Sequence, residues 1–292
     1  MMNMAVRVFL NKALVFGLTG LIFFFAPGIA GAGGPLVLQV HPYLPATELI
    51  ERFSPLAEHL SRSIGRPVVV RISVDYQQHI ELAGKDKTDI AFMGPASYVS
   101  LVDRHGKKPL LVRLEIDDKP TFRGAIITAK KSGLRSLSEL KGKRFAFGDP
   151  NSTMSHLVPR YMLSEAGVDI KDLAGHAFLH NHHNVALGVL VGRFDAGAVK
   201  SEVFYEYEER GLRVLAWSPE LSEHVFVTSS VLPKQTVDAL RSALSALAGS
   251  EDGRTALKRI NDRATGLVPV EDRDYDNLRT IIRALRKLGV EP

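Results

Sequence analysis

The sequence of 292 residues contains no cysteine. It therefore offers no disulfide bond, no thiolate ligand for a metal ion, and no cysteine that a lipid could modify. Basic residues are dispersed rather than clustered, and the net charge is only +5. Because a nucleic-acid-binding protein needs a clustered basic face, the composition gives no reason to expect a nucleic-acid partner. A small positive excess would instead help to attract small anions.

The first residues have the pattern of a secretory signal peptide. Arg7 and Lys12 precede a 14-residue apolar stretch over 13–26, and residues 30–32 supply an Ala-Gly-Ala cleavage motif. The stretch is shorter than the ~20 residues that a spanning helix needs, and no later segment is long and apolar enough to cross a membrane. We expect residues 1–32 to be removed. The mature chain, with a net charge of +3, is then expected to be a periplasmic monomer without a membrane anchor.

The rest of the chain alternates short apolar runs with segments of helical periodicity, which is typical of an α/β protein. Strands are expected at 36–40, 68–74, 89–93, 110–116, 123–129, 144–147, 177–180, 196–199, 213–217 and 225–229. Helices are expected at 49–64, 76–83, 95–104, 137–140, 156–166, 185–191 and 202–209, and throughout the segment after Pro233.

Two junctions divide this pattern into lobes. Polar residues 130–133 follow the strand at 123–129 and indicate a crossing into a second lobe, and the strand at 225–229 indicates the return. The terminal helices, without strands of their own to cover, are expected to pack on the first lobe. The predicted architecture is a two-lobed α/β protein with two crossings and a ligand cleft between the lobes. Lobe 1 comprises residues 33–127 and 226–292, and lobe 2 comprises residues 128–225.

The most informative motif is the segment 147–159, F-G-D-P-N-S-T-M-S-H-L-V-P, in which a strand leads into a turn and then a helix. Ser152, Thr153 and Ser155 lie at the carboxyl end of the strand, where open α/β sheets bind ligands. The first N–H groups of a helix lack internal partners and carry partial positive charge, so with these hydroxyls they can receive an anion. The same residue types are also ordinary helix caps.

Two tyrosines occupy corresponding positions in the first lobe. Tyr98 ends the segment 94–98, G-P-A-S-Y, one turn into a helix, where its phenol is free to reach the cleft. Tyr43 lies in the loop after the first strand. By spacing alone, either residue also suits ordinary packing on an amphipathic surface, as does Trp217, the only tryptophan.

Three histidines lie in the segment 180–184, H-N-H-H-N, ahead of a predicted helix. Zinc ligands on a helix face would be three or four residues apart, with a cysteine or carboxylate nearby, so we expect no metal and no other cofactor. A histidine at such a turn can instead donate to an anion and respond to pH. Ser152, His182 and Asp195 are the residue types of a hydrolase triad, but the G-x-S-x-G elbow is missing, so we do not expect an enzyme.

Several segments together resemble the phosphate/phosphite/phosphonate-binding family of periplasmic ABC-transporter receptors, which have a type II solute-binding fold. The resemblance covers nearly the whole mature chain in the same order. Its segments are 42–43 (P-Y), 53–60 (F-S-P-L-A-E-H-L), 65–69 (G-R-P-V-V), 89–99 (D-I-A-F-M-G-P-A-S-Y-V), 148–159, and 182–199, which ends in D-A-G-A-V.

The resemblance implies specific roles for the candidate residues. Ser152 and Thr153 would hold phosphonate oxygens. Tyr98 and His182 would add further hydrogen bonds, and Tyr43 would close over the ligand from the first lobe. Asp195 is implied to line the cleft.

The chain departs from the family's pattern in two places. Met154-Ser155 stands where family members commonly have Ser-Gly, and His183 stands where they commonly carry an acid. Met154 removes a neutral donor and His183 removes a negative charge that could pair with a ligand ammonium. An aminoalkylphosphonate is therefore a less suitable ligand for this chain.

The resemblance implies a receptor that captures a phosphonate-, phosphite- or phosphate-like oxyanion for an ABC permease of the inner membrane. Two alternatives stay open: a ligand sensor that feeds a sensor kinase, and a receptor for an anion without phosphorus. All of these functions require the hydroxyls of Ser152 and Thr153 to face the other lobe across a solvent-accessible gap, without Met154 filling that gap.

Overall fold

Two open sheets organise the computed structural model, which describes residues 34–290. The first has the strand order β13-β4-β12-β3-β1-β2, and β1 pairs in parallel with both β2 and β3. Its strands are β1 (Leu36–Val40), β2 (Val68–Ile72), β3 (Ile90–Met93), β4 (Leu110–Ile116), β12 (Val225–Thr228) and β13 (Ala264–Val268). Every residue of β3 is buried. A strand covered on both faces reads as a continuous apolar run, as predicted for this segment.

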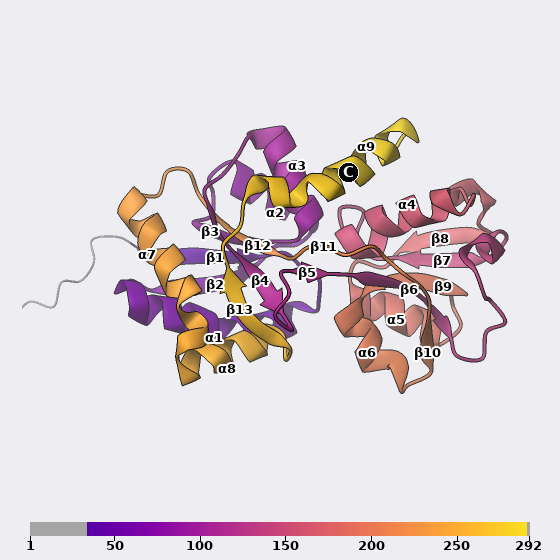
Figure 1. Cartoon of the computed structure of the whole chain (residues 1–292), viewed down its shortest axis with the longest axis horizontal. Helices are drawn as coiled ribbons and strands as arrows, with labels where there is room; N and C mark the ends of the chain where they lie inside the picture. The colour runs from indigo at the N-terminus through magenta and orange to yellow at the C-terminus, as the bar shows by residue number, and fades with distance from the viewer. Residues whose placement is uncertain (1–33, 291–292) are drawn as a thin grey trace, which may run out of the picture. The chain divides into compact units, whose positions relative to one another are not determined.

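The second sheet has the order β10-β6-β9-β7-β8, in which β7 pairs in parallel with β8 and β9. Its strands are β6 (Gly124–Ala129), β7 (Arg144–Phe147), β8 (Gly175–Phe178), β9 (Ala196–Lys200) and β10 (Leu212–Trp217). A two-stranded antiparallel pair, β5 (Thr121–Phe122) and β11 (Leu221–Ser222), lies in sequence between the sheets. We refer to the part built on each sheet as lobe 1 and lobe 2, and to β5 and β11 as the crossing strands (Figure 1).

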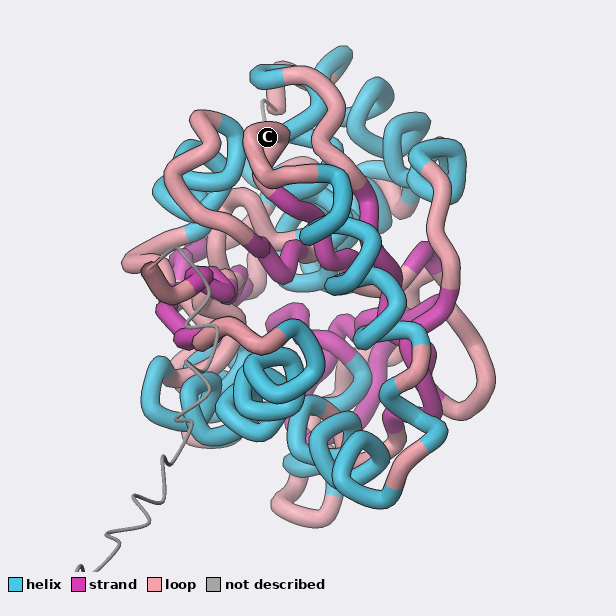
Figure 2. The backbone as a smooth tube through the Cα atoms, turned by 90° about the vertical axis from the view of Figure 1, so that its left-hand side faces the viewer, coloured by secondary structure: helices cyan, strands magenta, loops and turns pink. Residues whose placement is uncertain are grey.

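Helices lie on both sides of the strands (Figure 2). They are α1 (Ala46–Ile64), α2 (Tyr76–Gly84), α3 (Pro95–His105), α4 (Val158–Glu165), α5 (His182–Leu190), α6 (Ser201–Glu208), α7 (Lys234–Ser245), α8 (Glu251–Ile260) and α9 (Asp276–Lys287). In α1, Leu49, Phe53 and Leu60 are fully buried on one face, as their spacing predicts. Gly65 ends this helix in the left-handed conformation, with φ of 65°, which glycine adopts without steric cost.

The predicted crossing point into lobe 2 is wrong. The strand β6 is hydrogen-bonded into the second sheet, so the crossing precedes it at β5 rather than following it at 130–133. The predicted boundary after residue 127 therefore cuts through a strand of lobe 2. Lobe 1 resumes before the predicted residue 226, because β12 of the first sheet already begins at Val225.

The segment after Pro233 is also not wholly helical. Residues 264–268 form β13, an edge strand that pairs antiparallel with β4. Thr265 and Gly266 interrupt its apolar run, and only five residues form the strand, so no alternating pattern marked it. The terminal helices divide as well: α7 and α8 contact α1, as predicted, but α9 contacts both α3 of lobe 1 and α4 of lobe 2 (Figure 1).

Candidate anion-binding site

The connection between β7 and α4 ends with a single π-helical turn at Thr153–Leu157, which runs directly into α4. Within it, the N–H of Leu157 donates to the carbonyl of Ser152 at 3.0 Å. The Ser152 hydroxyl in turn accepts from the N–H of Ser155 at 3.3 Å, so its role as a helix cap is confirmed. A π-helical turn widens the first turn of a helix, and such turns are frequent at functional sites.

This turn meets the start of α3 in the other lobe. The backbone N–H of Ala96 donates to Thr153 Oγ1 at 2.9 Å. Gly94, which precedes α3, has no side chain to cap that helix, so a hydroxyl from lobe 2 occupies the place of a cap. Two helical N-termini, each carrying partial positive charge, therefore face one another across the lobes. We term Ala96, Ser97, Ser152 and Thr153 the candidate site.

One hydroxyl of the candidate site, that of Ser97, has no hydrogen-bond partner. The Ser97 side chain is fully buried in the first turn of α3, and its hydroxyl makes no hydrogen bond. An unpaired buried hydroxyl costs free energy comparable to a lost hydrogen bond, about 1 to 3 kcal/mol. Such orphaned groups call for an explanation, and a ligand that pairs with them is one.

The candidate site differs from the expectation in one respect: it is not a solvent-accessible gap. Ser152 is 3% exposed, Thr153 5% and Ser155 1%, because the lobes are in direct contact there. Ser155 also turns inward, with its Oγ against Gly148. The candidate site can therefore receive a ligand only if the contact between Ala96 and Thr153 opens.

Met154 is a buried side chain next to the candidate site. Its side chain packs beside the start of β6, where a Cβ built on Gly124 would lie 2.9 Å from Met154 Cβ. The thioether sulfur lies 3.5 Å from the Ser218 hydroxyl. Met154 is thus an apolar packing residue, 2% exposed, and it belongs to the same buried hydrophobic cluster as Ala96.

Tyr43 and His182 lie together where the lobes meet. The N–H of His182 donates to the carbonyl of Tyr43 at 3.4 Å, and His182 Nδ1 accepts from the N–H of Lys200 at 3.1 Å. The Lys200 ammonium lies 4.4 Å from the centroid of the Tyr43 ring. Burial, with Lys200 adding to it, lowers the pKa of His182 to about 3, so this imidazole is neutral.

Tyr98 and Asp195 lie elsewhere, contrary to expectation. The Tyr98 hydroxyl donates to Asp272 at 2.9 Å beside α9, because α3 directs this side chain toward the C-terminal segment rather than the lobe junction. Asp195 accepts from the backbone N–H of Arg144 at 2.8 Å and pairs with its guanidinium at 3.2 Å. Arg144 begins β7, whereas Ser152 follows the other end of that strand, so Asp195 does not line the junction.

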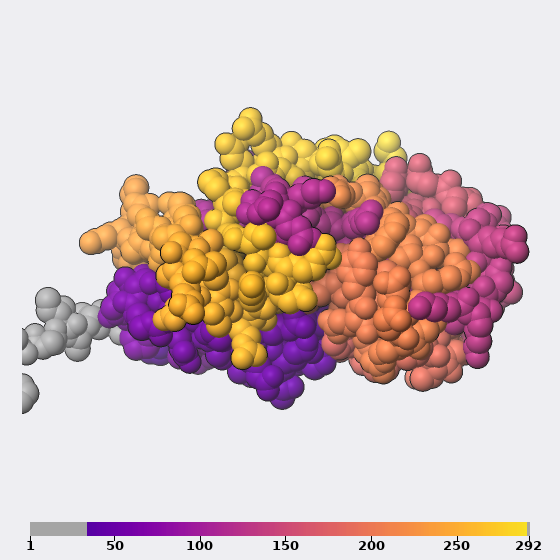
Figure 3. All heavy atoms as spheres, turned by 60° about the horizontal axis from the view of Figure 1, so that its bottom comes forward, coloured from indigo at the N-terminus to yellow at the C-terminus, as the bar shows by residue number. Residues whose placement is uncertain are grey.

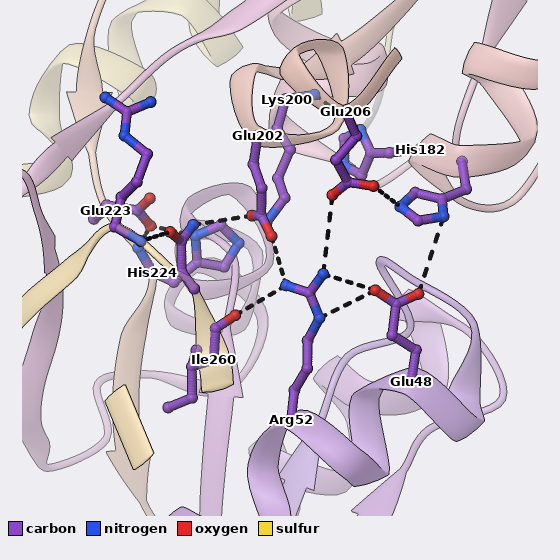
Figure 4. A network of polar contacts seen from close by, with 12 residues as sticks. Glu48, Arg52, His182, Lys200, Glu202, Glu206, Glu223, His224 and Ile260 are labelled. Carbon is purple, nitrogen blue, oxygen red and sulfur yellow. Dashed lines mark hydrogen bonds and ion pairs between the residues drawn. The ribbon is translucent and has the colours of Figure 1, made fainter. Parts of the chain in front are cut away.

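A network around Arg52 joins the lobes on another side (Figure 4). Arg52 of α1 donates to Glu202 of α6 at 2.6 Å and to the carbonyl of Ile260 at 3.1 Å. Burial opposes ionisation of Glu202, but Lys200 and Arg52 outweigh it and lower the pKa of Glu202 to about 2. His183 also belongs to this network, 3.2 Å from Glu206, and not to the candidate site.

A cleft of about 880 Å³ lies beside the Arg52 network. It is bounded by α1, α6, the end of α8 and the residues on and next to the crossing strands. Figure 3 shows the side of the molecule along which the atoms of the two lobes meet. Its charged lining residues carry both signs. They are Glu48, Glu51, Arg52, Asp117, Lys119, Arg123, Lys200, Glu202, Glu206, Glu220, Glu223, Lys258, Arg259, Asp262 and Arg263. None of the predicted ligand-binding residues lines this cleft; Tyr43 lines only a cavity of about 10 Å³ next to it.

Sequence reasoning missed a group of buried histidines. His41, His79 and His224 lie together on lobe 1, with the His41 ring 5.7 Å from the His79 ring and 5.2 Å from the His224 ring. Because they come from three distant parts of the chain, no local spacing connects them. Among the described residues 34–290, no group of three or more histidine or acidic side chains is arranged to hold a metal ion. Within the same residues, no helix is both long and apolar enough to span a membrane.

Comparison with known proteins defines the family. The model of the family described as "ABC transporter, phosphonate, periplasmic substrate-binding protein" matches residues 38–275. The chain belongs to this family. Its members are substrate-binding proteins of transporters rather than enzymes, and the family is periplasmic.

Individual relatives agree with the family match. The phosphate-import protein PhnD of Mycolicibacterium smegmatis is 27% identical over 271 residues, covering 84% of each chain. The probable ABC transporter phosphite binding protein PhnD1 of Prochlorococcus marinus is 26% identical over 257 residues, covering 82% of this chain and 86% of the relative. The solved structure of PhnD1 in complex with methylphosphonate is similar in fold, with a TM-score of 0.79 at 24% identity over 86% of this chain and 98% of PhnD1.

Proposed function

We propose that this receptor binds a phosphonate-, phosphite- or phosphate-like oxyanion at the candidate site and delivers it to an ABC permease. The observation that carries the proposal is the 2.9 Å hydrogen bond between Ala96 N–H and Thr153 Oγ1. This contact brings the N-termini of α3 and of the π-helical turn together, one from each lobe. A ligand oxygen in place of the Thr153 oxygen would accept from the same N–H.

The candidate site suits an oxyanion chemically. On separation of the lobes, the Ala96 N–H, the Ser97 and Thr153 hydroxyls and the free N–H groups of both helix starts become available as donors. Charge-assisted hydrogen bonds from such donors are about twice as strong as neutral ones. A tetrahedral anion offers several acceptor oxygens, so one ligand can bridge both lobes where at present one hydroxyl does.

Ligand binding would act by favouring one arrangement of the lobes over another. The crossing strands β5 and β11 are short, and hinges of this kind absorb rotation between lobes. A ligand that contacts both Ala96 and Thr153 interacts with the closed arrangement better than with an open one, which shifts the population toward closure.

The names of the relatives support the ligand class. One is a phosphate-import protein, one a phosphite binding protein, and the latter has been solved with methylphosphonate. We further propose that residues 1–32, which lie outside the described part of the chain, are a cleaved secretory signal, and that the receptor binds without turnover.

Titration calorimetry in a buffer without phosphate tests the proposed function. Phosphate, phosphite and methylphosphonate are the ligands, and sulfate and methanesulfonate are matched controls of similar shape. We expect saturable binding of at least one phosphorus anion. Lack of both heat and thermal shift with all three phosphorus anions would contradict the proposal, and binding of the sulfur anions alone would indicate a receptor for a different oxyanion.

A further inference from the structure

Two imidazoles point at the start of α3 from within lobe 1. His41 follows β1 and His224 precedes β12, and their rings stack with planes 16° apart. His41 is 1% exposed and His224 8%. A Cβ built on Gly94 would lie 3.5 Å from His41 Nε2 and 3.7 Å from His224 Nε2. Since Gly94 immediately precedes α3, both Nε2 atoms lie next to the first turn that contains Ala96.

The partners of the two Nδ1 atoms fix where the ring protons lie. His41 Nδ1 is 3.0 Å from the carbonyl oxygen of Phe92, which can only accept a hydrogen bond. His224 Nδ1 is 2.5 Å from Glu223 Oε2, a carboxylate oxygen (Figure 4). Each Nδ1 therefore carries a proton, and in a neutral ring Nε2 then presents a lone pair toward the start of α3.

A lone pair in this position repels an anionic oxygen unless a proton lies between them. We propose that oxyanion binding is coupled to protonation of His224 at Nε2, so that the receptor captures its ligand together with one proton. This inference rests on the proposed function of the candidate site. The imidazolium so formed donates Nε2–H to a ligand oxygen, which makes His224 a specificity-determining residue for the anion.

The surroundings favour His224 over its neighbours as the protonated ring. Glu223 is 3% exposed and accepts from both the backbone N–H of His224, at 2.6 Å, and its ring, so a buried carboxylate compensates the new charge. Glu202 and Lys200, which line the same small cavity as His224, pair with each other.

Three nearby histidines, His41, His79 and His182, lack such a carboxylate partner. Burial, followed by the nearness of His224, lowers the pKa of His41 well below its ordinary value. Burial also lowers the pKa of His79 to about 3 and that of His182, on lobe 2, to about 3. These rings stay neutral. The Tyr43 ring, which also packs on His224, is kept protonated by burial, which raises its pKa.

The coupling has a measurable consequence. By linkage, a ligand whose binding takes up one proton loses up to tenfold in affinity for each unit rise in pH. The ligand's own ionisation adds to this dependence, so the contribution of His224 is the difference between the wild type and a variant that lacks this imidazole.

Calorimetry of methylphosphonate in two buffers of different ionisation enthalpy, at one pH, measures the protons taken up for each ligand bound. The proteins are the wild type, His224→Gln, and His176→Gln, which changes an exposed histidine of β8. We expect wild type and His176→Gln to take up the same number of protons and His224→Gln to take up fewer. Equal uptake in all three proteins would overturn the inference while leaving the proposed function intact. If neither methylphosphonate, phosphite nor phosphate binds, both fail.

Nitrogen-15 NMR of the histidine rings in the unmutated protein gives a second readout that does not depend on a variant folding. On saturation with methylphosphonate, the two nitrogens of His224 are expected to move to imidazolium shifts, while those of His41 stay neutral. A His224 ring that remains neutral in the saturated complex would overturn the inference.

Discussion

The backbone N–H of Ala96 in lobe 1 donates to the side-chain oxygen of Thr153 in lobe 2, at 2.9 Å. These two residues, 57 positions apart in the sequence, bring together the start of α3 and the start of the π-helical turn at Thr153–Leu157. Both helix starts carry partial positive charge. In this arrangement the Thr153 hydroxyl accepts from the N–H that we assign to the ligand. A ligand that binds there has to take the place of this hydrogen bond.

Replacing Thr153 tests that assignment. Thr153→Val keeps the shape of the side chain but removes the hydroxyl, and should weaken oxyanion binding by about 1 to 3 kcal/mol, or roughly 5- to 150-fold. Thr153→Ser restores the hydroxyl and is the matched control, expected to bind within a few-fold of wild type. Calorimetry with methylphosphonate measures both, and equal affinity for Val and wild type would argue against a ligand contact at Thr153.

Two residues implied by the family resemblance should prove neutral for binding. Tyr98→Phe removes a hydroxyl bonded to Asp272, and Asp195→Asn weakens the pair with Arg144. Because neither side chain faces the candidate site, we expect ligand affinity to stay close to that of the wild type. A large loss of affinity in either variant would mean that the lobes rearrange on binding far more than a hinge rotation requires.

Met154 is expected to affect stability rather than ligand choice. Met154→Ser puts a hydroxyl back where family members commonly have one, but the side chain packs among Gly124 and Ser218. Its removal should lower the free energy of unfolding by about 2 kcal/mol or more, measured by urea denaturation. The relative affinities for phosphate, phosphite and methylphosphonate should stay unchanged, and a clear reordering would return Met154 to the ligand's surroundings.

The Arg52 network should set how readily the lobes separate without ligand. Arg52→Met removes the guanidinium that joins α1 to Glu202, at a cost of about 1 to 3 kcal/mol to the contact between lobes. Small-angle X-ray scattering of the ligand-free variant should show a larger radius of gyration than wild type. Arg62→Met, on the exposed part of the same helix, is the matched control. An unchanged radius of gyration in Arg52→Met would mean that the network does not hold the lobes together.

Acid should weaken the fold through Glu202. The folded-state pKa of Glu202 is lowered to about 2 from an ordinary 4.5, so its stabilising contribution is full above about pH 4.5 and is lost as the pH falls toward 2. Thermal denaturation over this range should show a steeper loss of stability in wild type than in Glu202→Gln, which cannot titrate. Parallel loss in both proteins would assign the acid sensitivity to other carboxylates.

Much of the fold could be predicted from the sequence because its elements are locally marked. The face of Leu49, Phe53 and Leu60 defines α1, and the buried run of β3 defines a central strand. The crossing point and β13 could not be predicted in the same way. Whether β6 belongs to lobe 1 or lobe 2 depends on its long-range pairing with β9 and β10, which leaves no signal within residues 124–129.

The site was predictable only in part, for a related reason. Ser152 and Thr153 follow a strand and cap a helix, and both properties are visible in the sequence. The direction of a side chain on a helix is decided by tertiary packing, so Tyr98 is turned to Asp272. The imidazoles of His41 and His224 come together only through the pairing of β1, β3 and β12, and no motif connects residues so far apart.

A crystal structure of the receptor with methylphosphonate tests the account most directly. We predict that the phosphonate lies between the lobes with its oxygens within hydrogen-bonding distance of Ala96 N and Thr153 Oγ1, which no longer bond each other. A phosphonate bound instead in the cleft beside Arg52, with the bond between Ala96 and Thr153 intact, would contradict it.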